Sequence, residues 1–441
     1  MSRRGWNRAS RGVCVFVFVL AFVFVVAASA GCRGRTSGTG AGTGTGTGTG
    51  AGTGTGTGTG TAAGMDAAAW REDLRALADE LPRRHVDPWF HVTEAAFRAA
   101  VADVDAHLDA MDDAHAQVAL ARLVAMIGDG HTALATPLGL MDLRYPLQLY
   151  VFDDGVFVTD AADPTLVGGR VVAIDGHAID DVVAALTPTI SHDNAGQLKG
   201  QLPWRLIAPD TLAGVDVAAS RWRATYRIEV GGQARDVALD ATRPRPPPPV
   251  AADAPLARQK HQYPYWNTWV EADHMVYLQY NACVDAPGQP FADFAAATLA
   301  FADGHPVERF VIDLRFNGGG NSELIRPLLD GLIARPALAR GLYVIIGRDT
   351  FSSAVLDAIL LARAGAVLVG EPSGGRPSHH GEVQTFTLPR SHLRVSYSTK
   401  YFDNPDFPGD AIEPAIAVPQ RAADWFAGRD PALDAIRAAA R

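Results

Sequence analysis

The chain has 441 residues, with 39 lysines and arginines against 48 aspartates and glutamates, and a formal net charge of −9 at pH 7. An acidic chain argues against nucleic acid as a partner, because nucleic-acid binding needs a basic face. The three cysteines show none of the spacings typical of zinc sites or disulfide frameworks, so we expect neither a metal nor any other cofactor.

Residues 1–31 are typical of a secretory signal peptide. Four arginines precede an apolar run from residue 13 to about residue 30, and Cys32 follows directly after small residues. This arrangement looks like a bacterial lipoprotein signal, in which Cys32 becomes the lipidated first residue of the mature chain. The alternatives are an ordinary signal peptide and an N-terminal anchor helix, since the run is nearly long enough to span a bilayer.

A nearly pure Gly-Thr repeat fills residues 37–61. Such a sequence cannot bury apolar surface, so residues 32–64 are predicted to be a disordered tether. Together with the signal, the tether predicts a protein of the bacterial cell envelope. We expect a lipid anchor to hold it to a membrane, on the periplasmic or the extracellular face.

Two regions of different character follow the tether. Trp70, Leu74, Leu77 and Leu81 recur at helical spacing, and residues 65–132 are predicted to form an N-terminal helical domain. In residues 133–242 short β-like runs alternate with turns, which predicts a β-rich module. Residues 243–262 contain a run of prolines typical of a stiff linker and a domain boundary.

Residues 263–441 have an α/β pattern. Apolar runs at residues 275–280, 310–314, 342–346 and 366–369 alternate with helical segments. This alternation predicts a mostly parallel sheet covered by helices on both faces. Ligands in such sheets bind outside the carboxyl ends of the strands.

Two segments at such strand ends could carry chemistry. Phe310–Gly320 runs from a strand into three glycines, and Leu342–Ser353 runs from the next strand into Ser352-Ser353 before a helix. A serine at a strand-to-helix turn gains from the helix N-terminus, and a glycine loop can present N–H groups to an oxyanion. Together they predict acyl-transfer chemistry. The alternative for the serine pair is a helix N-cap.

These segments resemble a known family. Val311-Ile-Asp-Leu-Arg-Phe-Asn-Gly-Gly-Gly320, Thr350-Phe-Ser-Ser-Ala354 and Gly370-Glu-Pro-Ser-Gly-Gly375 resemble the successive core motifs of the C-terminal processing (tail-specific) serine peptidases. They are more similar still to the branch that includes the tricorn core and the interphotoreceptor retinoid-binding repeats. Gly128-Asp-Gly-His-Thr132 resembles the histidine motif of that branch.

The resemblance covers roughly residues 67–420 and implies both a fold and an activity. It implies a ClpP/crotonase-like catalytic sheet in residues 263–441 and a PDZ-like module in residues 133–242, where Val171-Val-Ala-Ile-Asp-Gly176 carries the similarity. The implied activity is hydrolysis of peptide bonds in a polypeptide substrate.

Carried over by motif, the resemblance implies Ser352 as the nucleophile. The backbone N–H of Ser353, together with that of a glycine such as Gly318 or Gly319, would form the oxyanion hole. Where processing peptidases have a lysine base this chain has Arg376, and a guanidinium cannot act as a base.

In the tricorn-like branch a histidine is the base, supported by a carboxylate late in the chain. The resemblance implies His131 as that base, and Asp410 is our candidate carboxylate, with Asp406 and Glu413 as competitors. A turn histidine that caps the preceding helix is the alternative for His131. His379 and His380 are nearer in sequence to the core and are rival bases or parts of a substrate-binding loop.

Two other functions stay open. One is a non-catalytic protein that binds a peptide or an apolar ligand on the same fold, as the retinoid-binding relatives do. The other is an esterase with the same triad.

Overall fold

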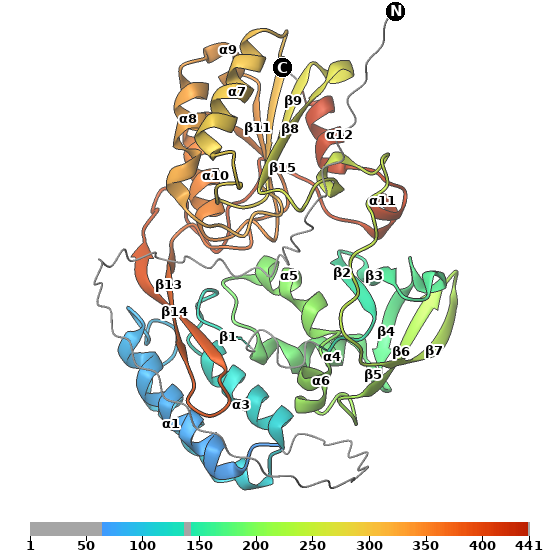
Figure 1. The fold of residues 1–441 in the computed structure, drawn as a ribbon, viewed down its shortest axis with the longest axis vertical. Coiled ribbons are helices and arrows are strands. Elements are labelled where there is room, and N and C mark those ends of the chain that lie inside the picture. Colours follow the sequence, from blue (N-terminus) through green and yellow to red (C-terminus); the bar gives the residue numbers. More distant parts are fainter. Residues whose placement is uncertain (1–63, 136–142, 440–441) are drawn as a thin grey trace, which may run out of the picture.

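The computed structural model describes residues 64–135 and 143–439, in which helices surround three sheets (Figure 1). The mixture of helices and sheets predicted from the sequence is confirmed. The predicted signal, the lipidated Cys32 and the tether up to residue 63 lie outside the described residues. In the part of the chain that is described, no helix combines the length and the apolar character needed to cross a membrane.

The N-terminal helices form a small cluster. They are α1 (Ala67–Arg84), α2 (Glu94–His107) and α3 (Asp113–Ala125). Each helix begins at a capping residue whose side chain accepts a backbone N–H of the first turn. The capping residues are Asp66, Thr93 and Asp112. The leucines predicted at helical spacing are buried between the helices.

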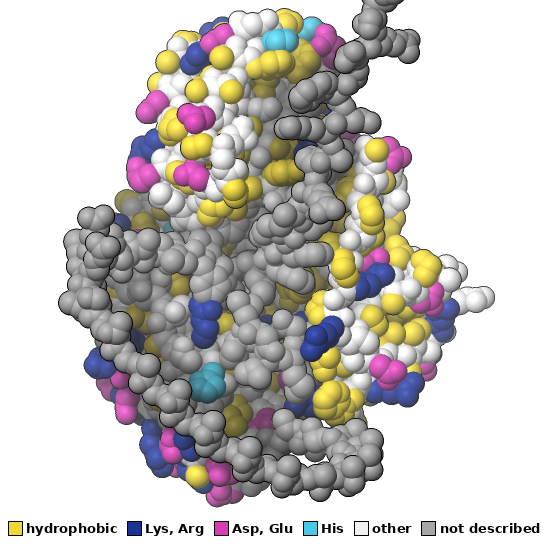
Figure 2. All heavy atoms as spheres, viewed as in Figure 1, with side chains coloured by type: hydrophobic (Ala, Val, Ile, Leu, Met, Phe, Trp, Pro, Cys, Tyr) yellow, Lys and Arg dark blue, Asp and Glu magenta, His cyan; other side chains and the backbone are white. Residues whose placement is uncertain are grey.

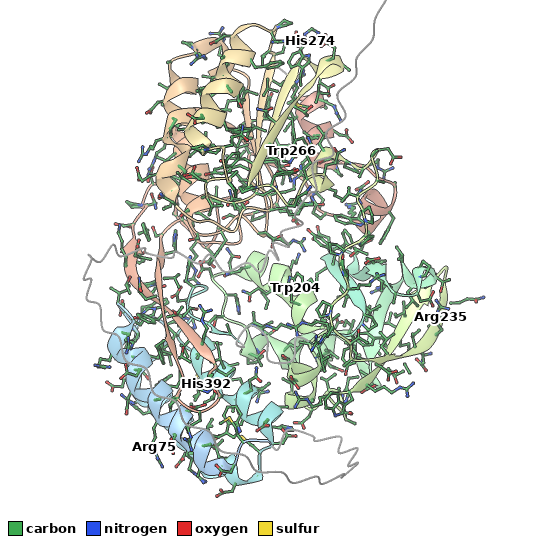
Figure 3. All side chains as sticks on the ribbon, in the orientation of Figure 1. Arg75, Trp204, Arg235, Trp266, His274 and His392 are labelled. Atoms are coloured by element: carbon green, nitrogen blue, oxygen red, sulfur yellow. The ribbon has the colours of Figure 1, made fainter. Side chains whose placement is uncertain are left out.

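A long hairpin from the C-terminal half of the chain completes this cluster. Strands β13 (His379–Thr387) and β14 (Arg394–Phe402) form an antiparallel sheet with the short β1 (Leu134–Ala135). Figure 3 shows His392, in the hairpin turn, beside the N-terminal helices and far from Trp266 of the core sheet. The hairpin therefore belongs to residues 263–441 in sequence, but it packs in the core of the helical cluster.

The β-rich region forms a second sheet with the order β2-β3-β4-β6-β7, and the short β5 pairs with β4. Three helices between its strands, α4 to α6, contribute to or lie against its apolar core. The bounds are β2 (Leu147–Phe152), β3 (Gly155–Ala161), β4 (Arg170–Ile174), β5 (His177–Ala178), α4 (Ile179–Leu186), α5 (Ala195–Arg205), α6 (Pro209–Gly214), β6 (Arg223–Val230) and β7 (Gln233–Asp240).

The third sheet has the order β15-β12-β11-β10-β9-β8. Its strands pair in parallel except β8, which is antiparallel to β9. The strands are β8 (Tyr265–Val270), β9 (Met275–Tyr280), β10 (Arg309–Asp313), β11 (Leu342–Ile346), β12 (Val367–Gly370) and β15 (Ile416–Ala417).

Helices cover both faces of this core sheet, which explains why its central strands are apolar throughout. Helices α7, α8 and α10 pack on one face and α12 on the other. The helix bounds are α7 (Phe291–Asp303), α8 (Arg326–Ile333), α9 (Pro336–Ala339), α10 (Ser353–Arg363), α11 (Ala422–Phe426) and α12 (Pro431–Ala438).

Basic and acidic side chains alternate over the described surface in Figure 2. On that face the described lysines and arginines do not gather into one patch.

Candidate active site

Ser352 lies at the sharp turn between β11 and α10. Its backbone has φ 54° and ψ −127°, a conformation that residues other than glycine rarely adopt. Such a residue costs on the order of 1–3 kcal/mol and persists only when its surroundings hold it in place. Ser352 occupies the N-cap position of α10, as the alternative from the sequence had it, but its side chain makes no capping hydrogen bond to the helix.

Hydrogen bonds of Thr350 hold this turn from both sides. The Thr350 hydroxyl donates to the carbonyl of Leu314 at 2.8 Å and accepts the N–H of Gly347 at 3.0 Å. The Thr350 carbonyl accepts the N–H groups of Gly374 and Gly375 at 3.0 and 3.1 Å. The turn that presents Ser352 is therefore fixed by contacts within the core.

The glycine loop after β10 lies directly against Ser352. Gly319 has φ 105°, and a Cβ at this position would stand 2.7 Å from the Cβ of Ser352 and 3.0 Å from the nitrogen of Ser353. Only a glycine can bring the loop this close to the serine turn. The Gly319 N–H, however, donates to Oδ1 of Asn317 at 2.9 Å, so it is already engaged.

The two other predicted oxyanion groups differ from Gly319. The N–H of Ser353 belongs to the first residue of α10, where no preceding carbonyl of the helix can accept it. A Cβ on Gly318 would meet nothing within 4 Å, so the space at this glycine is open. The hydroxyl of Ser353 donates to the carbonyl of Gly320 at 2.6 Å. Because the Gly319 N–H is already engaged, Ser353 and Gly318 are the remaining candidate oxyanion donors.

The structure brings His131 to the serine turn. Its ring stacks on that of Phe351, the residue before Ser352, with 4.2 Å between the ring centroids. The ring is 4% exposed, and neither nitrogen has a hydrogen-bond partner among the described residues. His131 is thus not hydrogen-bonded to Ser352 in this structure. A buried polar group without a partner is costly, and such groups often have a functional reason.

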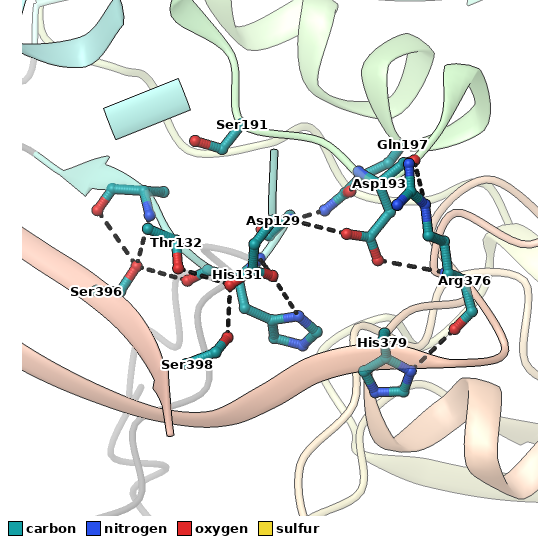
Figure 4. A network of polar contacts seen from close by, with 12 residues as sticks. Asp129, His131, Thr132, Ser191, Asp193, Gln197, Arg376, His379, Ser396 and Ser398 are labelled. Carbon is teal, nitrogen blue, oxygen red and sulfur yellow. Dashed lines mark hydrogen bonds and ion pairs between the residues drawn. The ribbon is translucent and has the colours of Figure 1, made fainter. Parts of the chain in front are cut away.

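Asp129 is the carboxylate beside His131 (Figure 4). Its Oδ1 lies 3.7 Å from Nδ1 of His131 and accepts the backbone N–H of that residue at 2.9 Å. Its Oδ2 accepts the hydroxyls of Thr132 and Ser398, each at 2.6 Å, and lies 3.1 Å from Nε2 of His85. Burial opposes ionisation of Asp129, but the nearby His131 imidazole and the hydrogen bonds with His85 and Ser398 outweigh it and hold the pKa of Asp129 well below the usual value.

Asp410, predicted as the supporting carboxylate, lies elsewhere. Its side chain is 79% exposed and its Oδ1 is 3.9 Å from Nε of Arg376. The competitor Asp406 forms an exposed ion pair with Arg363, and Glu413 is exposed. Asp129 is part of the Gly128-Asp-Gly-His-Thr132 motif, two residues before the histidine, and the sequence reasoning did not use that signal.

The rival histidines lie close to His131 but in other environments. His379 stacks on His131 with 5.5 Å between centroids, and its Nδ1 is 2.9 Å from the carbonyl of Arg376. Burial lowers the pKa of His379 to about 4. His380 packs against Phe90, and burial lowers its pKa as well. Both imidazoles line a small cavity of about 90 Å³.

No cluster of metal-ligating side chains accompanies these groups. Within residues 64–135 and 143–439, no three side chains of His, Cys, Asp or Glu come together in a way that could hold an ion.

Comparison with known proteins gives a match in structure but not in sequence. No protein-family model matches the chain, and no curated protein matches it in sequence. The fold is similar to that of mature CPAF complexed with lactacystin, with 15% identity, a TM-score of 0.61, and coverage of 84% of this chain and 98% of that chain. Mature CPAF gives 15% identity, a TM-score of 0.59, and coverage of 84% and 97%.

A photosystem II D1 C-terminal processing protease also matches, with 15% identity, a TM-score of 0.37, and coverage of 80% of this chain and 92% of that chain. At these identities the likenesses concern the fold. The similarity to mature CPAF, at TM-scores of 0.61 and 0.59, therefore shows a shared fold.

Proposed function

We propose that this chain is a serine peptidase that hydrolyses peptide bonds of polypeptide substrates. Ser352 is the nucleophile, His131 the general base, and Asp129 the carboxylate that supports the base. One observation carries the proposal: Ser352 lies in a strained strand-to-helix turn, and its neighbour Phe351 stacks on His131, a buried histidine whose ring nitrogens make no hydrogen bond to the described residues. Strain and unsatisfied polar groups both cluster at active sites.

The chemistry follows from these positions. Ser352 Oγ attacks the scissile carbonyl while His131 accepts its proton, and the N–H groups of Ser353 and Gly318 stabilise the oxyanion. Protonated His131 then gives its proton to the leaving amine, and Asp129 stabilises the charge that His131 carries meanwhile. Water enters as the second nucleophile and releases the acyl group. The Ser352–His131 hydrogen bond must form when substrate binds, since such contacts are often long in free enzymes.

The finer assignments of the fold belong to this proposal. The sheet of β8–β12 and β15 serves as the ClpP/crotonase-like catalytic core, and the region of β2–β7 serves as the PDZ-like module. An extended polypeptide adds as a strand to this module or to another sheet edge. We further propose that lipidated Cys32 and the Gly-Thr tether hold the enzyme at the bacterial cell envelope.

Labelling with a fluorophosphonate tests the nucleophile. Replacing Ser352→Ala is expected to abolish labelling of the full chain, because it removes the hydroxyl that the probe would phosphonylate with loss of fluoride. Ser353→Ala is the matched control, since its hydroxyl is engaged by the carbonyl of Gly320 and its N–H is retained. Undiminished labelling of the Ser352→Ala variant would show that the nucleophile lies elsewhere.

A second candidate is a non-catalytic binding protein on the same fold. The observation that favours it is the missing hydrogen bond between His131 and Ser352. A wild-type chain that is folded but never labels would favour binding over catalysis. An esterase shares the triad, and a panel of peptide and ester substrates separates it from a peptidase.

A further inference from the structure

Asp193 and Arg376 meet behind the loop that carries His131 (Figure 4). We propose that this pair, the Asp193–Arg376 joint, is a positioning device that fixes His131 against the serine turn. The inference rests on the proposed function of His131 as the base. It assigns a role to the arginine that replaces the family's lysine.

The joint connects three parts of the chain through buried contacts. Oδ1 of Asp193 accepts the N–H of Gly130 at 2.7 Å, one residue before His131. Its Oδ2 accepts the backbone N–H of Arg376 at 3.3 Å, and Nε of Arg376 donates to the carbonyl of Asp193 at 2.8 Å. Asp193 is 5% exposed and directly precedes Asn194, the N-cap of α5. It thus ties the His131 loop to the core.

Gly130 is held on its other side by Gln197 of α5. The Gln197 amide accepts the N–H of Asp193 at 2.6 Å and donates to the carbonyl of Gly130 at 3.4 Å. A Cβ on Gly130 would lie 2.3 Å from Oε1 of Gln197 and 2.8 Å from Oδ1 of Asp193. The loop before His131 therefore fits closely into a cradle of polar groups that the joint organises.

The charges around the joint would stabilise a positive charge on His131. Asp193 faces Arg376, His131 and Asp129, and Arg376 in turn faces Asp410. Burial raises the pKa of Asp193, while the neighbouring His131 opposes that change. The ionised carboxylate would stabilise the positive charge of His131 during proton transfer. A guanidinium does not act as a base, so Arg376 can donate to the Asp193 carbonyl without competing for the proton.

A double-mutant cycle tests the joint. The second-order rate constant of fluorophosphonate labelling is measured for the full chain, Asp193→Asn, Arg376→Met and the double variant. We expect each single change to slow labelling at least 10-fold. Asp193→Asn alters the acceptor of the Gly130 and Arg376 backbone N–H groups, and Arg376→Met removes the Nε donor to the Asp193 carbonyl. The double change should be no slower than the worse single one, because either loss opens the same joint. Asp181→Asn, an exposed change on α4, serves as the control.

The pH dependence separates positioning from general damage to the fold. Asp193→Asn removes a negative charge beside His131 and so disfavours its protonated form. We expect the acidic limb of the labelling rate to move to lower pH in Asp193→Asn and to stay in place in Asp181→Asn. The proposed joint would be wrong if the acidic limb of the labelling rate stayed in place in Asp193→Asn. It would also be wrong if the rate losses of the two single variants added in the double variant.

Hydrogen exchange gives a readout that does not depend on activity. Arg376→Met is expected to speed amide exchange in residues 128–132, and Ser352→Ala is expected to leave it unchanged. The Arg376 side chain is 32% exposed, so this variant should fold even if Asp193→Asn does not. If the wild-type chain is not labelled, the proposed peptidase is wrong, but the exchange test still applies. If the wild type is labelled, and Arg376→Met changes neither the exchange nor the labelling rate, the proposed joint is wrong.

Discussion

The two halves of the candidate site are built differently. The Ser352 turn is held by contacts from residues 314–375, all within the core sheet and its loops. The His131 loop is held by side chains from residues 85, 193, 396 and 398, which come from the helical cluster, the α5 region and the long hairpin. A local motif thus sets the position of Ser352, the proposed nucleophile, whereas the position of His131, the proposed base, depends on the assembly of distant segments.

Removing the proposed base is expected to have the largest effect on labelling. His131→Ala is expected to slow fluorophosphonate labelling 10³-fold or more, because an unassisted serine hydroxyl is a weak nucleophile. Adding Ser352→Ala should remove the residual labelling altogether, because the probe attaches to the Ser352 hydroxyl. If His131→Ala labels like wild type, His131 is not the base.

Gly319→Ala breaks the serine half alone. The added Cβ would press on Ser352 and strain a backbone at φ 105°, at a cost of about 1–3 kcal/mol. We expect labelling to fall about 10²-fold, the loss typical of a damaged oxyanion site. Gly304→Ala, at the end of α7, is the control with an ordinary φ. Equal labelling in both variants would show that the close approach of the glycine loop is not required.

Asp129→Asn disrupts the buried hydrogen bonds that hold the His131 loop. The amide cannot accept all the donors that converge on Asp129, and we expect a loss of about 3–5 kcal/mol in the free energy of unfolding. Calorimetry of wild type and variant measures this loss at pH 7. The folded-state pKa of Asp129 lies below that of the unfolded chain, so wild type loses the contribution as the pH falls below about 4. A difference in Tm that does not shrink at lower pH would contradict ionisation of Asp129.

His379→Gln should have the smallest effect. Because burial lowers the pKa of His379 to about 4, this imidazole is already neutral above about pH 5. We expect the pH profile of labelling between pH 5 and pH 8 to keep its shape in the variant, with a rate within about 10-fold of wild type. A profile that loses its acidic limb in His379→Gln would make His379 the base.

The sequence predicted the serine half better than the histidine half. Apolar strands, the glycine run and the serine pair are neighbours in sequence, so the pattern of residues 310–353 predicts both their sheet and their meeting point. His131 was chosen by resemblance, and the structure brings it to Phe351. Asp193, His85 and Ser398 carry no sequence signal, because their partners are tens to hundreds of residues away. Asp410 was chosen for its late position, which says nothing about its exposure.

The hairpin β13–β14 also sets when the site can exist during synthesis. Ser396 of β14 donates its hydroxyl to the carbonyl of His131, and Leu388, Leu393 and Val395 fill the core of the first helices. The ribosome makes that helical cluster early but completes its core only when residue 402 has emerged. At about 5–20 residues per second, this delay is roughly 15–50 s. A nascent chain that already contains both His131 and Ser352 therefore still lacks the strand that holds the His131 loop, and the candidate site cannot be complete until β14 has been made.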